Sequence, residues 1–597
     1  MQLVALPVAY QEALFAENAL EPLLKKSTRE AGRAKLDDPI VETCLETFGK
    51  LVTASAPTCA ALIKTIERDA AHARRNNAPA FEQSTVCAVL SVSPMALSRA
   101  QENSPSFAAI GQFSPNPGAN PASVACQQAM SGVWAKQQAA LTKLIKSKAA
   151  GAGVGREAML CWFSALFDLQ TNSRGAPGQR LKKNQRQPRD IASHGMMLNS
   201  TVVLLDWCEP FCNDDPKSAK ATKDFARLSP GWTGLGGPQR VHYEVEATLD
   251  KPEQGKALRS GSAAQADASL NASGFSHDAE DDEAELAAAI EDSLRSAAIE
   301  AETPGEEGEA AAAASPRVEK FENHFVSDAF WLTVRAIGVG VVPALQEAEQ
   351  LFRQIQDWTR QPDPRYARHL DSYTRQYNAL CGQVYAPELI TSLVSFYGLV
   401  GRWLSQLSSA ELATVPEHVV SDMAIVIEHL STFLPTQLVS NSGAGLGYAL
   451  GAMVELLRRG KVCKNQLVRE SMAKVLERML DCDRHPSTAD LAIAAKDALL
   501  SGDQPETVKG LMLTYVDLSK VLDTDGEVFD KNAARAGLAR LIELVLGRGP
   551  NDELGMPAGL VVKSGPGWYA FCDTLISECI FLFQDATGRL GDLRGMQ

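Results

Sequence analysis

The stretch NHFVSDAFWLTVRAIGVGVVPAL, residues 323–345, contains the most apolar run in the second half of the chain. Its apolar residues keep a helical spacing, but Arg335 and Pro343 interrupt the run between Ala329 and Leu345. A membrane-spanning helix needs about 20 consecutive, predominantly apolar residues. We therefore expect a packed helix here and no membrane span.

Apolar residues three and four apart also occur on both sides of this stretch, which is the pattern of amphipathic helices. The pattern returns from Phe325 to the end of the chain almost without pause, and no alternation typical of a sheet is evident. Upstream, the segments with this pattern are 37–75, 122–147, 156–169 and 195–211, the last of which we expect to end at Pro210.

The expected breaks between helices are short and rich in Pro, Gly, Ser and Asn, and they include QPDPRY (361–366), SNSGAG (440–445), RHPST (484–488) and GRGPNDELGMP (547–557). The sequence contains no exact internal repeat. A chain of 597 residues is also too long for one ordinary hydrophobic core. The predicted fold class is therefore all-α, an irregular armadillo-like helical solenoid with a long disordered acidic insert.

The charge balance argues against a nucleic-acid-binding protein. The formal net charge is -14 and the isoelectric point is near 5.3, whereas phosphate contacts need a clustered basic face. The basic stretch 171–190 lacks interleaved aromatic residues for base stacking, so a solvated loop is the better interpretation. The expected partners are proteins, with no nucleic acid and no membrane.

The sequence shows no pattern for a metal, a cofactor or a catalytic nucleophile. The twelve cysteines form no C-x-x-C pair, and the nine histidines have no metal-ligand spacing. The glycine-rich GAGLG (443–447) fits a turn between helices, and DTDGEVFDKNAA (523–534) lacks the acids of a calcium loop. The exposed-looking PEHVVSD (416–422) is explained better by helix capping than by a protein contact.

The cysteines indicate where the protein works. Several of them, including Cys161 and Cys572, lie in apolar helical patterns. We expect reduced core thiols in an intracellular protein. The lack of a basic signal-peptide start favours the cytoplasm and nucleus.

Residues 244–317 differ from the rest, because they hold few large apolar residues and many Ala, Ser, Gly, Glu and Asp. This composition predicts a disordered acidic linker. Inside it, a helical face is spaced at offsets of zero, three, four, seven and eight, formed by Leu286, Ala289, Ile290, Ser293 and Leu294. The acids before or within the start of this face are Glu280, Asp281, Asp282, Glu283 and Glu285. Acids in a first turn and alanines favour a short helix, here about 278–297.

This arrangement resembles the ubiquitin-interacting motif. The resemblance implies that Leu286, Ile290 and Leu294 bury against the hydrophobic patch of ubiquitin, while Ala289 allows close approach and Ser293 offers a hydroxyl to backbone groups. It also implies that Asp281, Asp282, Glu283 and Glu285 face the basic rim of ubiquitin. A single short helix binds weakly, so selectivity would come from multivalency. A chance amphipathic pattern in an alanine-rich linker is the alternative.

Several separated stretches resemble the core of the ubiquitin chain-elongation factors. Besides residues 323–345 they are 156–174, 195–211, 416–423, 463–480, 528–535 and 571–586. In 463–480 the family's Pro-Tyr is replaced by Gln466 and Leu467. The resemblance implies an N-terminal helical segment (1–80), a first core part (81–243), the linker (244–317) and a second core part (318–597).

In that family the reaction is an aminolysis, in which a lysine of ubiquitin attacks the thioester on a conjugating enzyme. The family contributes positioning, so the resemblance implies no catalytic residue, no metal and no cofactor in these residues. It implies as partners ubiquitin, ubiquitylated substrates, a ubiquitin-conjugating enzyme, a hexameric AAA unfoldase and proteasome shuttle factors. The role implied is polyubiquitin chain assembly for proteasomal degradation.

Family members continue into a C-terminal U-box that holds the charged conjugating enzyme, and no U-box pattern appears in these 597 residues. The expectation is therefore either a truncated sequence or a core-only relative, and transfer by these residues alone is in doubt. Two alternatives stay open at this point. One is a non-catalytic ubiquitin-binding adaptor, and the other is a generic helical scaffold.

Overall fold

The computed structural model describes most of the chain outside the acidic linker. The chain divides into two units, 1–250 with 323–597 and 251–322, and every described residue belongs to the first. The described residues are 39–54, 56–76, 84, 86–95, 121–148, 151, 153–174, 192–212, 325–360, 367–413, 415–441, 443–460, 462–463, 465–518, 531–546 and 566–595.

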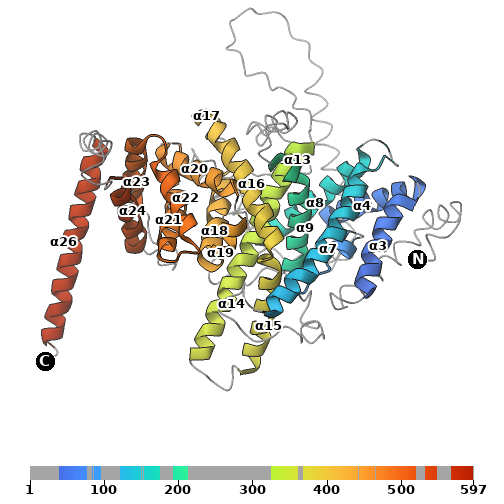
Figure 1. The fold of residues 1–597 in the computed structure, drawn as a ribbon, viewed down its shortest axis with the longest axis horizontal. Helices are drawn as coiled ribbons and strands as arrows, with labels where there is room; N and C mark the ends of the chain where they lie inside the picture. Colours follow the sequence, from blue (N-terminus) through green and yellow to red (C-terminus); the bar gives the residue numbers. More distant parts are fainter. Residues whose placement is uncertain are drawn as a thin grey trace, which may run out of the picture. The chain divides into compact units, whose positions relative to one another are not determined.

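The described residues are mainly helical, with no β-strand among them (Figure 1). The helices before the linker are α3 (Pro39–Ala54), α4 (Ala56–Asn76), α5 (Cys87–Leu90), α7 (Pro121–Lys146), α8 (Val154–Arg174) and α9 (His194–Cys212). Those after it begin with α13 (Phe325–Ala336), η6 (Ile337–Val341), α14 (Val342–Arg360), α15 (Ala367–Val384), α16 (Pro387–Gln406), α17 (Ser409–Leu412) and α18 (Glu417–Phe433).

The remaining helices are α19 (Pro435–Asn441), α20 (Gly445–Arg458), α21 (Gln466–Leu480), η7 (Asp481–Arg484), α22 (Ala489–Leu500), α23 (Gln504–Leu518), α24 (Lys531–Leu546) and α26 (Pro566–Gly595). The predicted all-α class is confirmed. The predicted breaks at SNSGAG and RHPST are confirmed as well, because they separate α19 from α20 and η7 from α22.

One continuous helix, α13 with η6 and α14, occupies the middle of the unit. Every residue from Val326 to Val342 is buried, so this helix is covered on all sides. Its length and composition would allow it to cross a membrane, but 94% of its most apolar window is buried inside the protein. Burial in a helical core accounts for this apolar composition.

The neighbours of this helix come from both parts of the chain. Helices α8 and α9 pack on it from before the linker, and α15 and α18 pack on it from after the linker. Its rings form an aromatic cluster with α16, in which Trp403 lies 5.4 Å from Phe330 and 5.6 Å from Trp331 between ring centroids. Segments separated by the linker therefore share one core.

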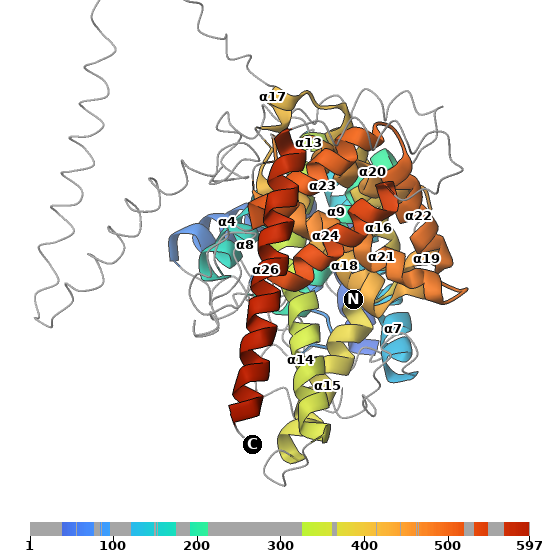
Figure 2. The same ribbon diagram turned by 90° about the vertical axis from the view of Figure 1, so that its left-hand side faces the viewer.

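The helices pack mainly on neighbours close in chain order, as in a solenoid. Helix α3 packs on α7 and α4 packs on α8, so the first described helices lie directly on the core. Further along, α16 packs on α20, α18 on α21, and α23 on both α24 and α26 (Figures 1 and 2).

The contact between α16 and α20 depends on glycines. A methyl group at Gly398 would lie 2.6 Å from the Cα of Gly445, and one at Gly401 would lie 2.5 Å from the carbonyl oxygen of Tyr448. Since the opposing atoms belong to the backbone, they cannot give way without moving the helix. The missing side chains are what allow the two helix backbones to approach this closely.

Three local expectations need correction. Pro210 does not end α9, which continues to Cys212, because a proline in the last turn removes only one intrahelical hydrogen bond. Helix α8 likewise runs past Leu169 to Arg174, into the stretch expected to be a loop. The segment 416–423 is neither exposed nor side-chain capped, because Val419, Val420 and Asp422 are buried and Pro416 stands at the N-cap.

The cysteines, all of which lie within the described ranges, form no disulfide, as expected for thiols. Six of them are buried, but Cys161 and Cys572, which the pattern placed in the core, are only partly buried, and Cys579 is exposed.

We predict that Gly398→Ala destabilises the protein by about 1–3 kcal/mol, because the added methyl group must push α20 away from α16. The matched control is Gly447→Ala on α20, where no atom lies within 4 Å of the added methyl group. This control should be neutral or gain up to about 1 kcal/mol from helix propensity. Denaturant unfolding measures both, and equal effects would contradict the close contact.

Candidate functional site

The ubiquitin-interacting residues predicted from the sequence lie outside the described residues. They are Asp281, Asp282, Glu283, Glu285, Leu286, Ala289, Ile290, Ser293 and Leu294. Their predicted role therefore stays a prediction. The described unit offers a surface groove, a buried polar frame and one unusually apolar helix face.

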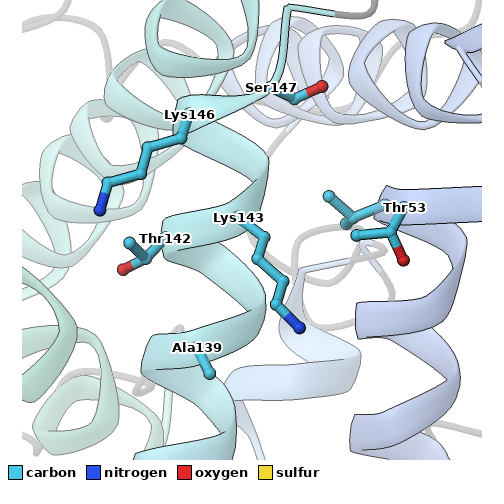
Figure 3. A pocket seen from close by; sticks show the side chains of 7 residues that line it. Thr53, Ala139, Thr142, Lys143, Lys146 and Ser147 are labelled. Atoms are coloured by element: carbon cyan, nitrogen blue, oxygen red, sulfur yellow. The ribbon is translucent and has the colours of Figure 1, made fainter.

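The groove lies between α3 and α7 and has a volume of about 470 Å³ (Figure 3). Its lining is mostly apolar, and it is formed by Val52, Thr53, Ala139, Thr142, Lys143, Lys146 and Ser147. Figure 3 shows the Lys143 ammonium directed into the space between the two helices. At the upper end the Ser147 hydroxyl lies 3.2 Å from the Cys59 thiol.

The electrostatics of the groove are set by the basic last turn of α7. Lys143 and Lys146 lie where cations are favoured by the helix dipole. Behind them, the pKa of Asp206 is raised, mainly by burial and then by the charge of Glu209. A hydrogen bond from Thr142, at 3.5 Å, and the charge of Lys146 act in the opposite direction.

The groove offers mostly apolar surface beside two lysine side chains. The lining residues include no histidine or carboxylate that could serve as a general base for Ser147. Among the residues that the structure describes, no group of three or more His, Cys, Asp or Glu side chains could hold a metal ion. The groove can receive an apolar side chain beside a carboxylate, with Lys143 as the counter-charge.

A buried polar frame fixes the non-helical residues 91–95 against the core. Asn199 of α9 donates to the carbonyl oxygens of Leu90 and Val92 at 2.8 and 2.7 Å. Its own Oδ1 accepts hydrogen bonds from Trp134 at 2.7 Å and from Gln383 at 2.8 Å. The side chain of Asn199 thus connects α9, α7 and α15 with the end of α5 and the loop that follows it.

A second buried group connects α8, α13 and α18. Arg335 forms an ion pair with Asp168 at 2.5 Å and donates to the hydroxyl of Thr171 at 3.3 Å. Burial and the charge of Arg335 lower the pKa of His418 to about 4. This group holds a charge deep in the protein, where a buried cation requires a partner.

Asp422 of α18 is the most perturbed carboxyl group of the described unit. Burial raises its pKa to about 8, and its Oδ2 atom has no hydrogen-bond partner among the described residues. Tyr397 of α16 is also buried, its hydroxyl lacks a partner there too, and burial with the charge of Asp422 raises its pKa well above the ordinary value. The pair is closed to solvent, so it affects stability and offers no access to a substrate.

The sequence interpretation missed the apolar face of α26, where Tyr569, Ile576 and Phe583 are exposed. Their seven-residue spacing is present in the sequence and indicates one apolar helix face. It was hidden because Phe571, Phe581 and Leu582 make the sequence of this helix apolar at other positions as well. The groove had no comparable signal, since it depends on how α3 lies on α7.

Together these features define a class of protein, an all-α helical array with an enclosed core, a surface groove between α3 and α7 and one exposed apolar helix face among its described residues. Its family follows from sequence comparison. The family model for the ubiquitin elongating factor core matches residues 88–597, so the chain belongs to this family. No curated protein matches the sequence.

We predict that Asp422→Asn stabilises the protein at pH 8 much more than at pH 5. The folded protein keeps the Asp422 proton up to pH 8 or so, whereas the ordinary pKa of an aspartate is 3.8. Deprotonation therefore opposes folding, and the stability contributed by this group falls as pH rises between these values. Asparagine cannot lose that proton.

Denaturant unfolding of both proteins across this pH range measures the difference. His418 and His429, whose pKa values burial lowers to about 4, reduce stability as pH falls below 6.5, but they do so equally in both proteins. A stability difference that is the same at every pH would show that Asp422 is not protonated in the folded state.

Proposed function

We propose that this protein promotes the assembly of polyubiquitin chains on substrates destined for proteasomal degradation and that it acts as a scaffold. The observation that carries the proposal is the family match over residues 88–597, which includes nearly all of the described helical unit. The partners proposed are ubiquitin, ubiquitylated substrates and a ubiquitin-conjugating enzyme, with an AAA unfoldase and proteasome shuttle factors downstream. The proposed location is the cytoplasm and nucleus.

The chemistry needs no nucleophile from the scaffold. The amine of a ubiquitin lysine attacks the thioester carbon on the conjugating enzyme, an amide bond forms, and the cysteine thiolate of that enzyme leaves. Holding two reactants in the correct geometry can lower the barrier by about 7–11 kcal/mol. The enclosed core around the Val326–Val342 segment supports this role, because close-packed interiors resist deformation.

The linker segment 281–294 supplies the proposed ubiquitin contact. Leu286, Ile290 and Leu294 form the apolar face, and the preceding acids supply charge for a basic surface. One such helix gives a small interface and weak binding. A scaffold that also holds the substrate raises the effective concentration of ubiquitin at the segment, so weak binding is sufficient.

The proposal is tested by a chain-extension assay with activating enzyme, conjugating enzyme and a mono-ubiquitylated substrate, with and without this protein. We expect longer ubiquitin chains when the protein is present, because it holds the reacting groups together. Substrate chain length on a gel is the measurement. Ubiquitin binding without any chain extension would contradict the elongation role and would favour a ubiquitin-binding adaptor.

For the linker segment, we predict that Ala289→Trp or Ser293→Ala weakens ubiquitin binding without changing the thermal unfolding temperature. The first change blocks close approach, and the second removes a hydroxyl hydrogen bond. Chemical-shift titration of labelled ubiquitin measures the affinity. Ala288 falls on the opposite side of the same helix, so Ala288→Trp is the matched control and should bind normally. Unchanged titration shifts in both test variants would remove the segment from the binding site.

A further inference from the structure

The groove between α3 and α7 opens where an ion pair between these helices does not repeat. Near the start of α3, Glu42 pairs with Lys136 of α7 at 2.5 Å. Further along both helices, a methyl group added at Gly49 would lie 3.8 Å from the Cβ atom of Ala140, so α3 and α7 run in the same direction. Lys143 follows Lys136 by seven residues and lies on the same face of α7. The corresponding position on α3, seven residues after Glu42, is Gly49, which has no side chain.

Lys143 therefore receives no counter-charge from α3. The sequence of α3 contains two carboxylates, and the second of them, Glu46, forms an ion pair with Lys50 at 3.0 Å. Lys143 is exposed, and within the described ranges no carboxylate pairs with it. Figure 3 shows its ammonium in the space between the two helices, whereas the Lys146 side chain extends away from α3. A single cation thus faces the groove.

The hydroxyl groups that line the groove already have partners. The Thr53 hydroxyl donates to carbonyl oxygens of its own helix at 3.3 Å. The Thr142 hydroxyl donates to the carboxylate of Asp206 at 3.5 Å, and the Ser147 hydroxyl lies 3.2 Å from the Cys59 thiol. The polar group of the lining that still needs a partner is therefore the ammonium that faces the groove.

We propose that this groove binds an acidic amphipathic segment of a partner protein, with a large aliphatic side chain against Val52 and Ala139 and a carboxylate on Lys143. The lining is mostly apolar, and a volume of about 470 Å³ is ample for one aliphatic side chain. Side chains three or four residues apart on a helix lie on one face, so both groups can enter the groove together.

The charge of the groove selects a carboxylate over a phosphate. A phosphorylated side chain carries more negative charge and three acceptor oxygens, which need several donors. The groove offers one ammonium, because its hydroxyl groups are engaged within the protein. A carboxylate therefore matches the site, as Glu42 already matches Lys136 on the same pair of helices.

This contact differs from the one proposed for ubiquitin. The linker segment would use acids of this chain on a basic surface, whereas the groove uses a cation of this chain on an acidic segment. The two contacts therefore select partners of opposite charge. The groove is small and its lysine is exposed, so we expect weak, reversible binding that declines as salt screens the ion pair.

The test is fluorescence anisotropy of a labelled synthetic helical peptide, with leucines on one face and glutamates beside them, titrated with the full chain. We expect saturable binding that Lys143→Glu weakens by roughly tenfold or more, because the ion pair becomes a repulsion. Lys64→Glu on α4, an exposed lysine outside the groove, is the matched control and should bind normally. Peptides with glutamine for glutamate, or serine for leucine, should bind as weakly as the Lys143→Glu variant does.

A second variant fills the groove from within. Gly49→Glu supplies the missing carboxylate to Lys143, and its Cβ atom would make only ordinary contact with α7, so the protein should fold normally, as thermal unfolding checks, and lose peptide binding. Gly132→Glu adds the same charge to α7 where no atom lies within 4 Å of the new Cβ, and it should bind normally.

Three results would overturn the proposal. The first is no saturable peptide binding up to ~1 mM, or binding that neither Lys143→Glu nor Gly49→Glu weakens. The second is tighter peptide binding after Leu286→Ser with Ile290→Ser, which would show that the acidic linker of this chain occupies the groove. The third is binding to phosphatidylserine vesicles through Lys143 without binding of the peptide, which would assign the lysine to a membrane surface.

Discussion

The enclosure of the Val326–Val342 helix is the constraint on which the rest of the structure depends. A helix covered on all sides gains stability from its apolar residues, but each polar group that it carries needs a partner from a neighbouring helix or from its own backbone. Arg335 meets this need through Asp168 and Thr171 of α8, and Thr333 donates to Ala329 within the helix. The position of α8 against α13 is therefore fixed by charge as well as by packing.

The sequence predicted the class of fold because helical spacing is a local property, present in each segment independently of the others. Features that depend on two distant segments could not be predicted in the same way. The approach of Gly398 to Gly445 and the pairing of Arg335 with Asp168 become visible only when the helices are packed. The predicted linker site at 281–294 was equally local, but its residues lie outside the described part, so it stays a prediction.

Some local signals were also misjudged, and the reasons are physical. Pro210 was given the effect of a proline in a helix interior, yet in the last turn its missing N–H costs little. The segment 416–423 looked exposed because it contains charged residues, but Asp422 avoids the penalty for a buried charge by keeping its proton. A charged residue type in a sequence therefore does not establish a charged group in the folded protein.

Among the described helices, α26 packs mainly on α23, and its other side exposes apolar side chains to solvent. Stacked helices bury one another's apolar faces, so a helix at the edge needs a polar outer surface to remain in water. In helix α26 the paired polar group lies on the inner side, where Glu578 meets Arg535, and the outer side keeps Ile576 and Phe583 exposed. Because these exposed side chains bury no apolar surface, the outer side of α26 adds little to the stability of the described unit, and the attachment of the helix depends on its inner side.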